Sequence, residues 1–208
     1  MPSSSSDRVT CIIATLKKLF PRVRSALTYE KPYEFLLAVM LSAQTTDVRV
    51  NKVTPHLFTR YPSLQHIAEA SVADLADTIR SIGLSHTKAQ NMKATAQWLL
   101  KNHEGRVPTR LDELIVLPGV GRKTANVVIA ELGGEISGIA VDTHVIRLAQ
   151  KYGLSTHADP IKIERDLISS IPRREWKTFT LRLILYGREY CPAHCKTCPK
   201  CPLWKCIV

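Results

Sequence analysis

Three observations predict an all-α protein. Apolar residues recur with the 3.6-residue period of amphipathic helices through nearly the whole chain. No segment alternates apolar and polar residues for long enough to build a sheet, and Ile139–Val141 is too short to count. Helix start and stop signals bracket the periodic segments. We therefore expect helices joined by loops.

Capping residues, prolines and glycines give the expected helix boundaries in chain order. Pro21 ends the first helix, Pro32 suits the first turn of the second, and Ser71 with Asp74 forms a capping-box start. Asp159 is placed to cap a later helix. The expected helices span about residues 7–20, 32–41, 47–59, 72–80, 86–102, 111–117, 122–132, 141–152, 160–171 and 174–187.

The chain is strongly basic. Its 208 residues include 29 Lys and Arg against 18 Asp and Glu, a formal net charge of +11. Such an excess repels itself unless a polyanion neutralises it, and nucleic acid is the commonest polyanion. No apolar run of about eighteen residues could span a membrane, and residues 1–8 lack a secretory layout. We expect a cytoplasmic, nucleoid-associated protein with no membrane partner.

Five of the six cysteines lie in the last eighteen residues, from Cys191 to Cys206. Without an export signal, clustered cysteines indicate a metal centre before disulfides. Four thiolates suit zinc as well as an iron–sulfur cluster, and the residue types leave both open. The sixth, Cys11, lies on an apolar helix face with Ile12 and Leu16, which predicts a buried structural thiol.

The segment Leu117–Ala125 joins two expected helices through a turn with two glycines, Gly119 and Gly121. Glycine permits positive φ and close backbone approach, so N–H groups of the turn and of the next helix can face an anion. A tight helix–helix corner would also explain Gly-x-Gly. Because Arg122 and Lys123 follow directly in a basic chain, we favour a sequence-independent grip on a DNA phosphate.

Four segments occur in the order and at the spacings of one known family: Leu41–Asp47, Leu117–Asn126, Val141–His144 and the cysteine run. On these motifs the chain resembles the endonuclease III family of helix-hairpin-helix base-excision DNA glycosylases over almost its whole length. The resemblance implies a bifunctional glycosylase and abasic-site lyase that removes oxidised pyrimidines and then nicks the strand by β-elimination. The implied partner is double-stranded DNA with a damaged base or abasic site, bound by a monomer.

The resemblance also implies that Lys123 is the nucleophile and Asp142 its carboxylate partner. A carboxylate stabilises the oxocarbenium-like species at C1′, and an amine can attack C1′ to form a Schiff base. On the residues alone, a phosphate contact for Lys123 and a helix cap for Asp142 are favoured. A lysine here matches the bifunctional branch. The alternatives are a monofunctional mispair- or purine-specific glycosylase of the same fold and, more distantly, a non-catalytic DNA-binding metalloprotein.

Such an enzyme must extrude the damaged nucleotide, because C1′ is inaccessible while the base is stacked. The resemblance implies that Gln44 enters the vacated space and Leu84 wedges the opposite side of the stack. It also assigns Gly119, Gly121 and Arg122 to the DNA backbone. On the residues alone, Leu84 would be a small core anchor and Gln44 a polar residue at a helix end.

The family's cysteine pattern, Cys-x6-Cys-x2-Cys-x5-Cys, implies a [4Fe–4S] cluster bound by Cys191, Cys198, Cys201 and Cys206, with zinc as the alternative metal. This chain departs from the pattern in two ways. The last spacing is x4, and Cys195 is an additional thiol inside the first loop. Cys206 is the expected fourth ligand, because Cys195 lies in the loop that the family leaves without a ligand.

The resemblance further implies two helical lobes. A six-helix barrel would span residues 25–135, with the helix-hairpin-helix at about 111–132. Residues 1–24 and 136–208 would form the cluster lobe, with the cluster loop at 191–206. We expect DNA to bind in the cleft between the lobes, with Lys123 and Asp142 at its mouth.

Overall fold

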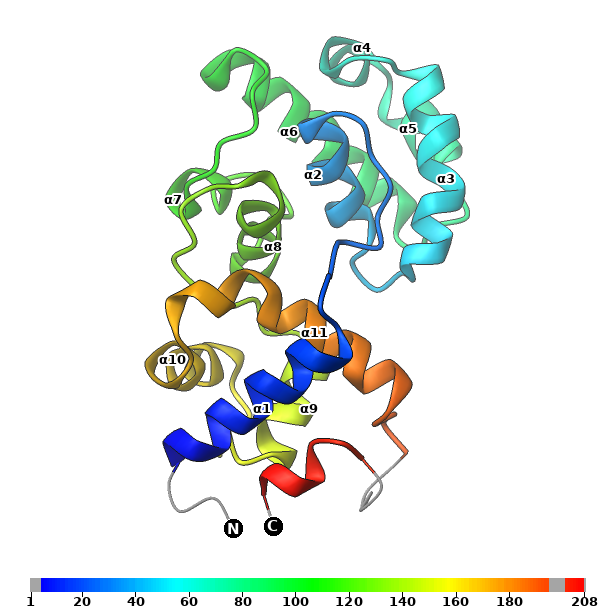
Figure 1. Ribbon diagram of the computed structural model, residues 1–208. Helices are drawn as coiled ribbons and strands as arrows, with labels where there is room; N and C mark the ends of the chain where they lie inside the picture. Colours follow the sequence, from blue (N-terminus) through cyan, green and yellow to red (C-terminus); the bar gives the residue numbers. More distant parts are fainter. Residues whose placement is uncertain (1–4, 195–200, 208) are drawn as a thin grey trace. The chain divides into compact units, whose positions relative to one another are not determined.

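The computed structural model describes residues 5–194 and 201–207, and within these ranges every regular element is a helix (Figure 1). This confirms the predicted all-α class. The α-helices are α1 (Ser5–Leu19), α2 (Pro32–Leu41), α3 (Asp47–Arg60), α4 (Leu64–Glu69), α5 (Val72–Thr78), α6 (Ser85–His103), α7 (Leu111–Leu114), α8 (Arg122–Leu132), α9 (Thr143–Lys151), α10 (Pro160–Ser170) and α11 (Trp176–Glu189), with short 3₁₀ helices η1 (Arg173–Glu175) and η2 (Trp204–Cys206). Each helix of the described chain is too short or too polar to cross a membrane.

The local capping signals define most boundaries well. The hydroxyl of Ser71 accepts from the N–H of Asp74, and the carboxylate of Asp159 accepts from the N–H of Lys162. Pro32 occupies the first turn of α2, and α8 spans the predicted 122–132. In α5 and α10 the capping side chain reaches an N–H three residues ahead, so tertiary contacts are not needed to place it.

Several elements differ from expectation, three of them for a clear local reason. Helix α4 was not predicted, because its six residues give too few turns for a periodic signal. Helix α7 ends at Leu114 instead of 117, and the Leu117 N–H then donates to the Leu114 carbonyl in a tighter turn. Helix α11 begins at Trp176, because the residues before it form the 3₁₀ turn η1.

The chain divides into two compact units. Residues Ser25–Glu135 form one unit, which we call the continuous unit; Met1–Arg24 and Ile136–Val208 form the other, the discontinuous unit. The division after Glu135 falls in the stretch that follows Gly133 and Gly134, where Gly133 closes α8 in a left-handed conformation (φ 85°).

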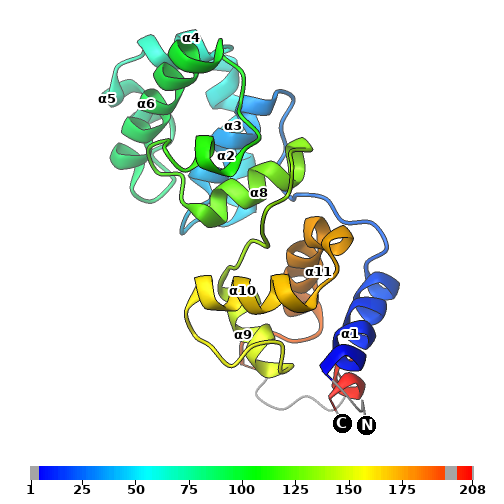
Figure 2. The ribbon, with the colours of Figure 1, turned by 90° about the vertical axis from the view of Figure 1, so that its left-hand side faces the viewer.

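Helix α2 is the central element of the continuous unit. It packs against α3, α6 and α8 (Figures 1 and 2). A helix surrounded in this way must be apolar on every face, which explains the unbroken run Phe35–Leu41, all of it buried. The opposite side of α6 packs against α4 and α5. The loops that carry Gln44 and Leu84 therefore leave from the ends of firmly packed helices.

The discontinuous unit is built around α11, which packs against both α1 and α9 (Figure 1). Its core includes the fully buried Tyr152 and Tyr186, whose hydroxyls lie 3.1 Å apart. At the other end of α11, the buried Glu175 carboxylate binds Lys17 of α1 at 2.8 Å and Arg182 at 3.2 Å. These contacts join the two ends of the chain into one unit.

Candidate DNA-binding and active-site residues

The hairpin between α7 and α8 requires glycine at one of its two positions. Gly119 has φ 77°, and a Cβ added there would lie 2.6 Å from the amide nitrogen of Asn91. Gly121 has ordinary extended geometry, φ −85°, and open space where a side chain would be. Buried Leu117 and Val120 hold the turn from inside. Gly119 thus uses the positive φ that glycine permits, whereas the missing side chain of Gly121 leaves the start of α8 uncovered.

Arg122 and Lys123 are both exposed in the first turn of α8. Gly121 supplies no side-chain cap for this turn, so the positive end of the helix is not covered by a protein carboxylate or hydroxyl at its N-cap. On the opposite face of α8, Ala125 and Val128 are completely buried. The Lys123 side chain therefore stands on a packed helix and faces solvent.

Asp142 caps helix α9 of the discontinuous unit. Its Oδ1 accepts a hydrogen bond from the Val145 N–H at 2.9 Å, and its Oδ2 lies 3.3 Å from Nδ1 of His144. The side chain is 18% exposed. The capping role favoured by the residues alone is confirmed, and it leaves one edge of the carboxylate open to solvent. The pairing of Asp142 with Lys123, which lies in the other unit, stays a prediction.

Gln44 and Leu84 share an unusual backbone conformation. Both are non-glycine residues with positive φ, 55° for Gln44 and 59° for Leu84. Such residues are sparsely populated and cluster at functional positions. Leu84 is 63% exposed, so its interpretation as a core anchor is wrong. Gln44 is also exposed, in the loop between α2 and α3.

Lys88 was not identified from the sequence as a functional residue. Its side chain is 7% exposed, and Nζ donates to the carbonyls of Leu41 and Ala43 and to the hydroxyl of Thr45. Burial lowers the pKa of this ammonium. No sequence signal could have found it, because a lysine in a helical pattern usually lies on the solvent-exposed face.

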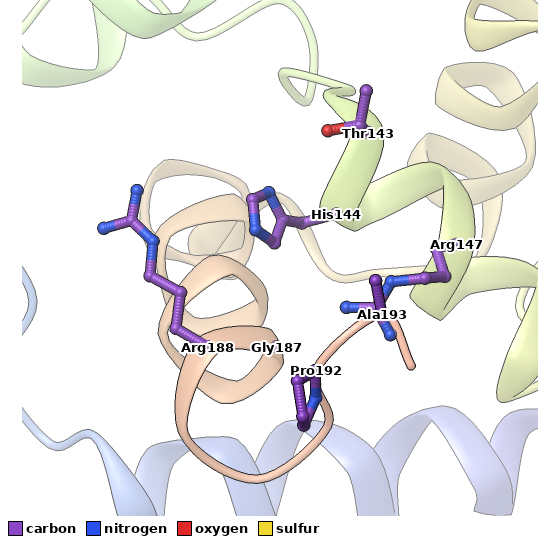
Figure 3. A pocket seen from close by; sticks show the side chains of 7 residues that line it. All are labelled: Thr143, His144, Arg147, Gly187, Arg188, Pro192 and Ala193. Carbon is purple, nitrogen blue, oxygen red and sulfur yellow. The ribbon is translucent and has the colours of Figure 1, made fainter. Parts of the chain in front are cut away.

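A basic cavity of about 400 Å³ lies at the start of α9, where Thr143 and His144 line it (Figure 3). Gly187 makes room for it, since an added Cβ would lie 3.1 Å from Arg147 Nη2 and 3.2 Å from His144 Cδ2. Two arginines and a histidine next to the start of α9 make a setting that suits an anion. The lining residues are Thr143, His144, Arg147, Gly187, Arg188, Pro192 and Ala193.

Three of the four predicted metal ligands are described, and two of them, Cys191 and Cys201, are buried free thiols. Burial raises the pKa of the Cys191 thiol, but hydrogen bonds from Lys151, Tyr152 and Arg147 outweigh this effect and leave that pKa below its usual value. A thiol that ionises readily suits a metal ligand. Cys195 and Cys198 lie outside the described residues, and no three candidate ligands gather elsewhere in the part of the chain that the structure describes.

Cys206 forms a disulfide with Cys11, across 195 positions of the sequence. The prediction that Cys11 is an unbonded structural thiol is therefore wrong. No local pattern indicates this pair, because α1 and η2 meet only in the folded unit. A disulfide sulfur has no thiolate to offer, so this bond and the predicted ligand role of Cys206 exclude each other.

Residues 37–173 match the family described as HhH-GPD superfamily base excision DNA repair protein. Because the match covers well over half of the chain, the protein belongs to this superfamily. Within it, the chain is similar to endonuclease III of Synechocystis sp., at 44% identity over 97% of this chain and 92% of that protein. Endonuclease III of Bacillus subtilis is 39% identical over 89% of this chain and 84% of its own length.

Solved structures show the same relationship. A trapped endonuclease III–DNA covalent intermediate matches with a TM-score of 0.90 and 39% identity, covering 97% of this chain and 95% of that one. A non-covalent endonuclease III–DNA complex matches equally well, with 38% identity over 98% of this chain and 95% of that one. A thermostable thymine-DNA glycosylase has a TM-score of 0.78 at 24% identity over 96% and 94% of the two chains, which is a likeness of fold alone.

Proposed function

We propose that this protein excises oxidised pyrimidines from double-stranded DNA and then cleaves the resulting abasic strand by β-elimination. The observation that carries this proposal is an exposed lysine, Lys123, in the first turn of the helix that follows the Gly119 hairpin. Endonuclease III of Synechocystis sp. is 44% identical to this chain over 97% of its length. One solved relative was trapped as a covalent intermediate with DNA, the kind of species that an amine nucleophile forms.

In the proposed mechanism, Asp142 stabilises the positive charge that develops on the deoxyribose as the bond from C1′ to the base breaks. The Lys123 amine attacks C1′, and opening of the sugar ring gives a Schiff base. Loss of a C2′ proton then expels the 3′ phosphate. Water hydrolyses the imine and returns the free amine. Asp142 holds its orientation through Val145 and His144, so no reorganisation is needed when charge appears.

DNA phosphates are the proposed ligands of two basic features. The hairpin would bind one phosphate through Gly119, Gly121 and Arg122, independently of sequence. The cavity lined by His144, Arg147 and Arg188 would bind another next to Asp142. Since Lys123 and Asp142 belong to different units, we propose that the duplex is bound between the units and that both act on the same sugar.

Gln44 and Leu84 are the proposed probes of the duplex. Leu84 is exposed at a turn, which suits a wedge between stacked bases. Gln44 has donors and acceptors to replace those of the lost base pair. The positive φ of both residues projects each side chain from a tight turn instead of a regular helix.

We propose a [4Fe–4S] cluster held by Cys191, Cys198 and Cys201, with Cys206 as the fourth ligand when its bond to Cys11 is reduced. The low pKa of the Cys191 thiol supports this set. The cluster would act as a scaffold that secures the basic C-terminal segment. A broad absorption band near roughly 400 nm, which thiolate-bound iron produces, distinguishes it from zinc. A colourless protein containing zinc would contradict this assignment.

The decisive experiment incubates the protein with a duplex that carries one thymine glycol, and sizes the products. We expect strand nicking by β-elimination, and a borohydride-trapped complex on abasic DNA that Lys123→Ala abolishes. Arg122→Ala is the matched control, because it removes the neighbouring cation and should weaken DNA binding while it keeps the trapped complex. Base release without nicking, or activity confined to mispaired duplexes, would indicate the monofunctional alternative.

We further propose that the protein acts as a cytoplasmic monomer on nucleoid DNA, which gel filtration and imaging of the tagged protein can test.

A further inference from the structure

Lys88 of α6 forms a buried connection to the loop after α2. Its ammonium donates to the Leu41 carbonyl at 2.9 Å, the Ala43 carbonyl at 2.7 Å and the Thr45 hydroxyl at 3.1 Å. An ammonium has three N–H donors, so these three acceptors satisfy it fully. They are neutral groups at the C-terminal end of a helix, where the helix dipole favours a positive charge.

Two of these acceptors belong to the residues on either side of Gln44. Ala43 and Thr45 bracket Gln44, whose φ of 55° is unfavourable for a residue with a side chain. A strained residue persists only where its surroundings over-determine it. Lys88 supplies that constraint, because one ammonium fixes the positions of both neighbours at once.

Lys88 is also hydrogen-bonded to Leu84, the second proposed probe of the duplex. The backbone N–H of Lys88 donates to the Leu84 carbonyl at 3.0 Å and closes the first turn of α6. Leu84 has φ 59° and a side chain that is 63% exposed. Lys88 therefore bonds through its backbone to Leu84 and through its side chain to both neighbours of Gln44, two loops that lie forty positions apart in the chain.

We propose that Lys88 is a positioning residue that sets Gln44 and Leu84 at a fixed separation before DNA arrives. This inference rests on the proposed roles of Gln44 and Leu84 in opening the duplex. Because the two side chains are already positioned, they can enter the base stack without the entropic cost of ordering two loops. More of the free energy of binding is then available to drive extrusion of the nucleotide. A side chain without donors at position 88 removes the hydrogen bonds to the carbonyls of Leu41 and Ala43 and releases the turn at Gln44.

The test compares Lys88→Met with Lys93→Met. Methionine keeps the length of the side chain and removes the donors. Lys93 is a matched control, since it also lies on α6 and donates to a loop carbonyl, that of Ala70 at 2.8 Å, away from both probes. Two single-turnover rates are measured: excision of thymine glycol from a duplex, and β-elimination at a preformed abasic site, where no base has to be unstacked. The fluorescence of 2-aminopurine beside the lesion reports unstacking directly.

We expect Lys88→Met to slow excision and the fluorescence rise at least tenfold, and to change β-elimination less than threefold. Lys93→Met should leave all three rates within twofold of wild type. Equal losses in excision and β-elimination, or no loss in either, would overturn the inference. A wild-type protein inactive on thymine glycol would instead reject the proposed function itself.

Two further variants guard against misfolding of Lys88→Met. Thr45→Val removes one acceptor near the surface and keeps the lysine, and should slow excision severalfold with the same selectivity. Lys88→Arg retains charge and donors and should recover part of the excision rate. If Thr45→Val excises as fast as wild type and Lys88→Arg is as slow as Lys88→Met, Lys88 has no positioning role.

Discussion

His144 and Asp142 form a side-chain pair within the first turn of α9, with Nδ1 of His144 3.3 Å from Oδ2 of Asp142. The other carboxylate oxygen, Oδ1, accepts the Val145 N–H. Both oxygens of the proposed catalytic carboxylate are thus oriented by the helix that it caps. Capping and catalysis are compatible uses of one side chain, because they employ different parts of the carboxylate.

Asp142→Asn and Asp142→Ala should separate these two uses. Asparagine keeps an oxygen that can accept from Val145, so we expect nearly unchanged stability and a fall in excision rate of about 10²–10³-fold from lost electrostatic stabilisation. Alanine should additionally lower the unfolding free energy by about 1 kcal/mol. Denaturant titration and single-turnover kinetics measure the two effects. A fully active Asp142→Asn protein would remove the carboxylate from the mechanism.

His144→Ala should act through Asp142. Loss of one hydrogen bond to a charged group is worth about 1.5 kcal/mol, which corresponds to about a tenfold slower excision. In the double variant with Asp142→Asn, the His144 substitution should have little further effect, because its partner charge is gone. Fully additive losses in this cycle would show that His144 works independently of Asp142.

Leu84 and Leu117 offer a comparison between an exposed leucine and a buried one. Leu84→Ala removes a side chain that is 63% exposed, so stability should stay within about 0.5 kcal/mol of wild type while excision falls. Leu117→Ala leaves a hole in the core beneath the hairpin and should cost about 2–5 kcal/mol. Thermal unfolding and excision assays on both variants check this contrast. Strong destabilisation by Leu84→Ala would contradict the exposed wedge.

Glu175 should make the discontinuous unit sensitive to acid. The hydrogen bond from Lys17 lowers the pKa of this carboxyl, burial opposes the effect, and the charges of Lys17 and Arg182 reinforce it. A folded-state pKa below the unfolded value stabilises the fold above the unfolded pKa of about 4.3, and this stability is lost as pH falls through the folded value. Between pH 7 and pH 3, the unfolding free energy of Glu175→Gln should therefore fall less steeply than that of the wild type. At pH 7 the variant should already have the lower unfolding free energy. Parallel pH profiles would reject this contribution.

The Cys11–Cys206 bond can be tested by a tryptic map. Cleavage after Arg8, Lys17 and Lys205 places Cys11 in peptide 9–17 and Cys206 in peptide 206–208, apart from every other cysteine. Protein alkylated at lysis and digested without reductant should contain the joined pair, and reduced protein the two separate peptides. Cys11→Ser removes the competing partner of Cys206 and should raise iron content, whereas Cys206→Ser should lower it. Full iron loading of Cys206→Ser would exclude this cysteine as a ligand.

The helices and the chemistry of the hairpin could be predicted because their signals are local. Helix α8 begins and ends where the residues around it predict, and the lysine after Gly121 is exposed because only the opposite face of that helix is apolar. Capping by Ser71, Asp142 and Asp159 follows the same logic, since each side chain reaches an N–H three residues ahead.

Short-range signals account for the helical segments, their ends, and the residue types available for DNA chemistry. The exposure of Leu84, the burial of Lys88 beneath the loop of Gln44 and the pairing of Cys11 with Cys206 instead follow from long-range packing. Each of these outcomes depends on groups that lie tens to hundreds of residues apart. Such contacts form when apolar faces of different helices are buried against one another, and periodicity within one helix does not specify its partner.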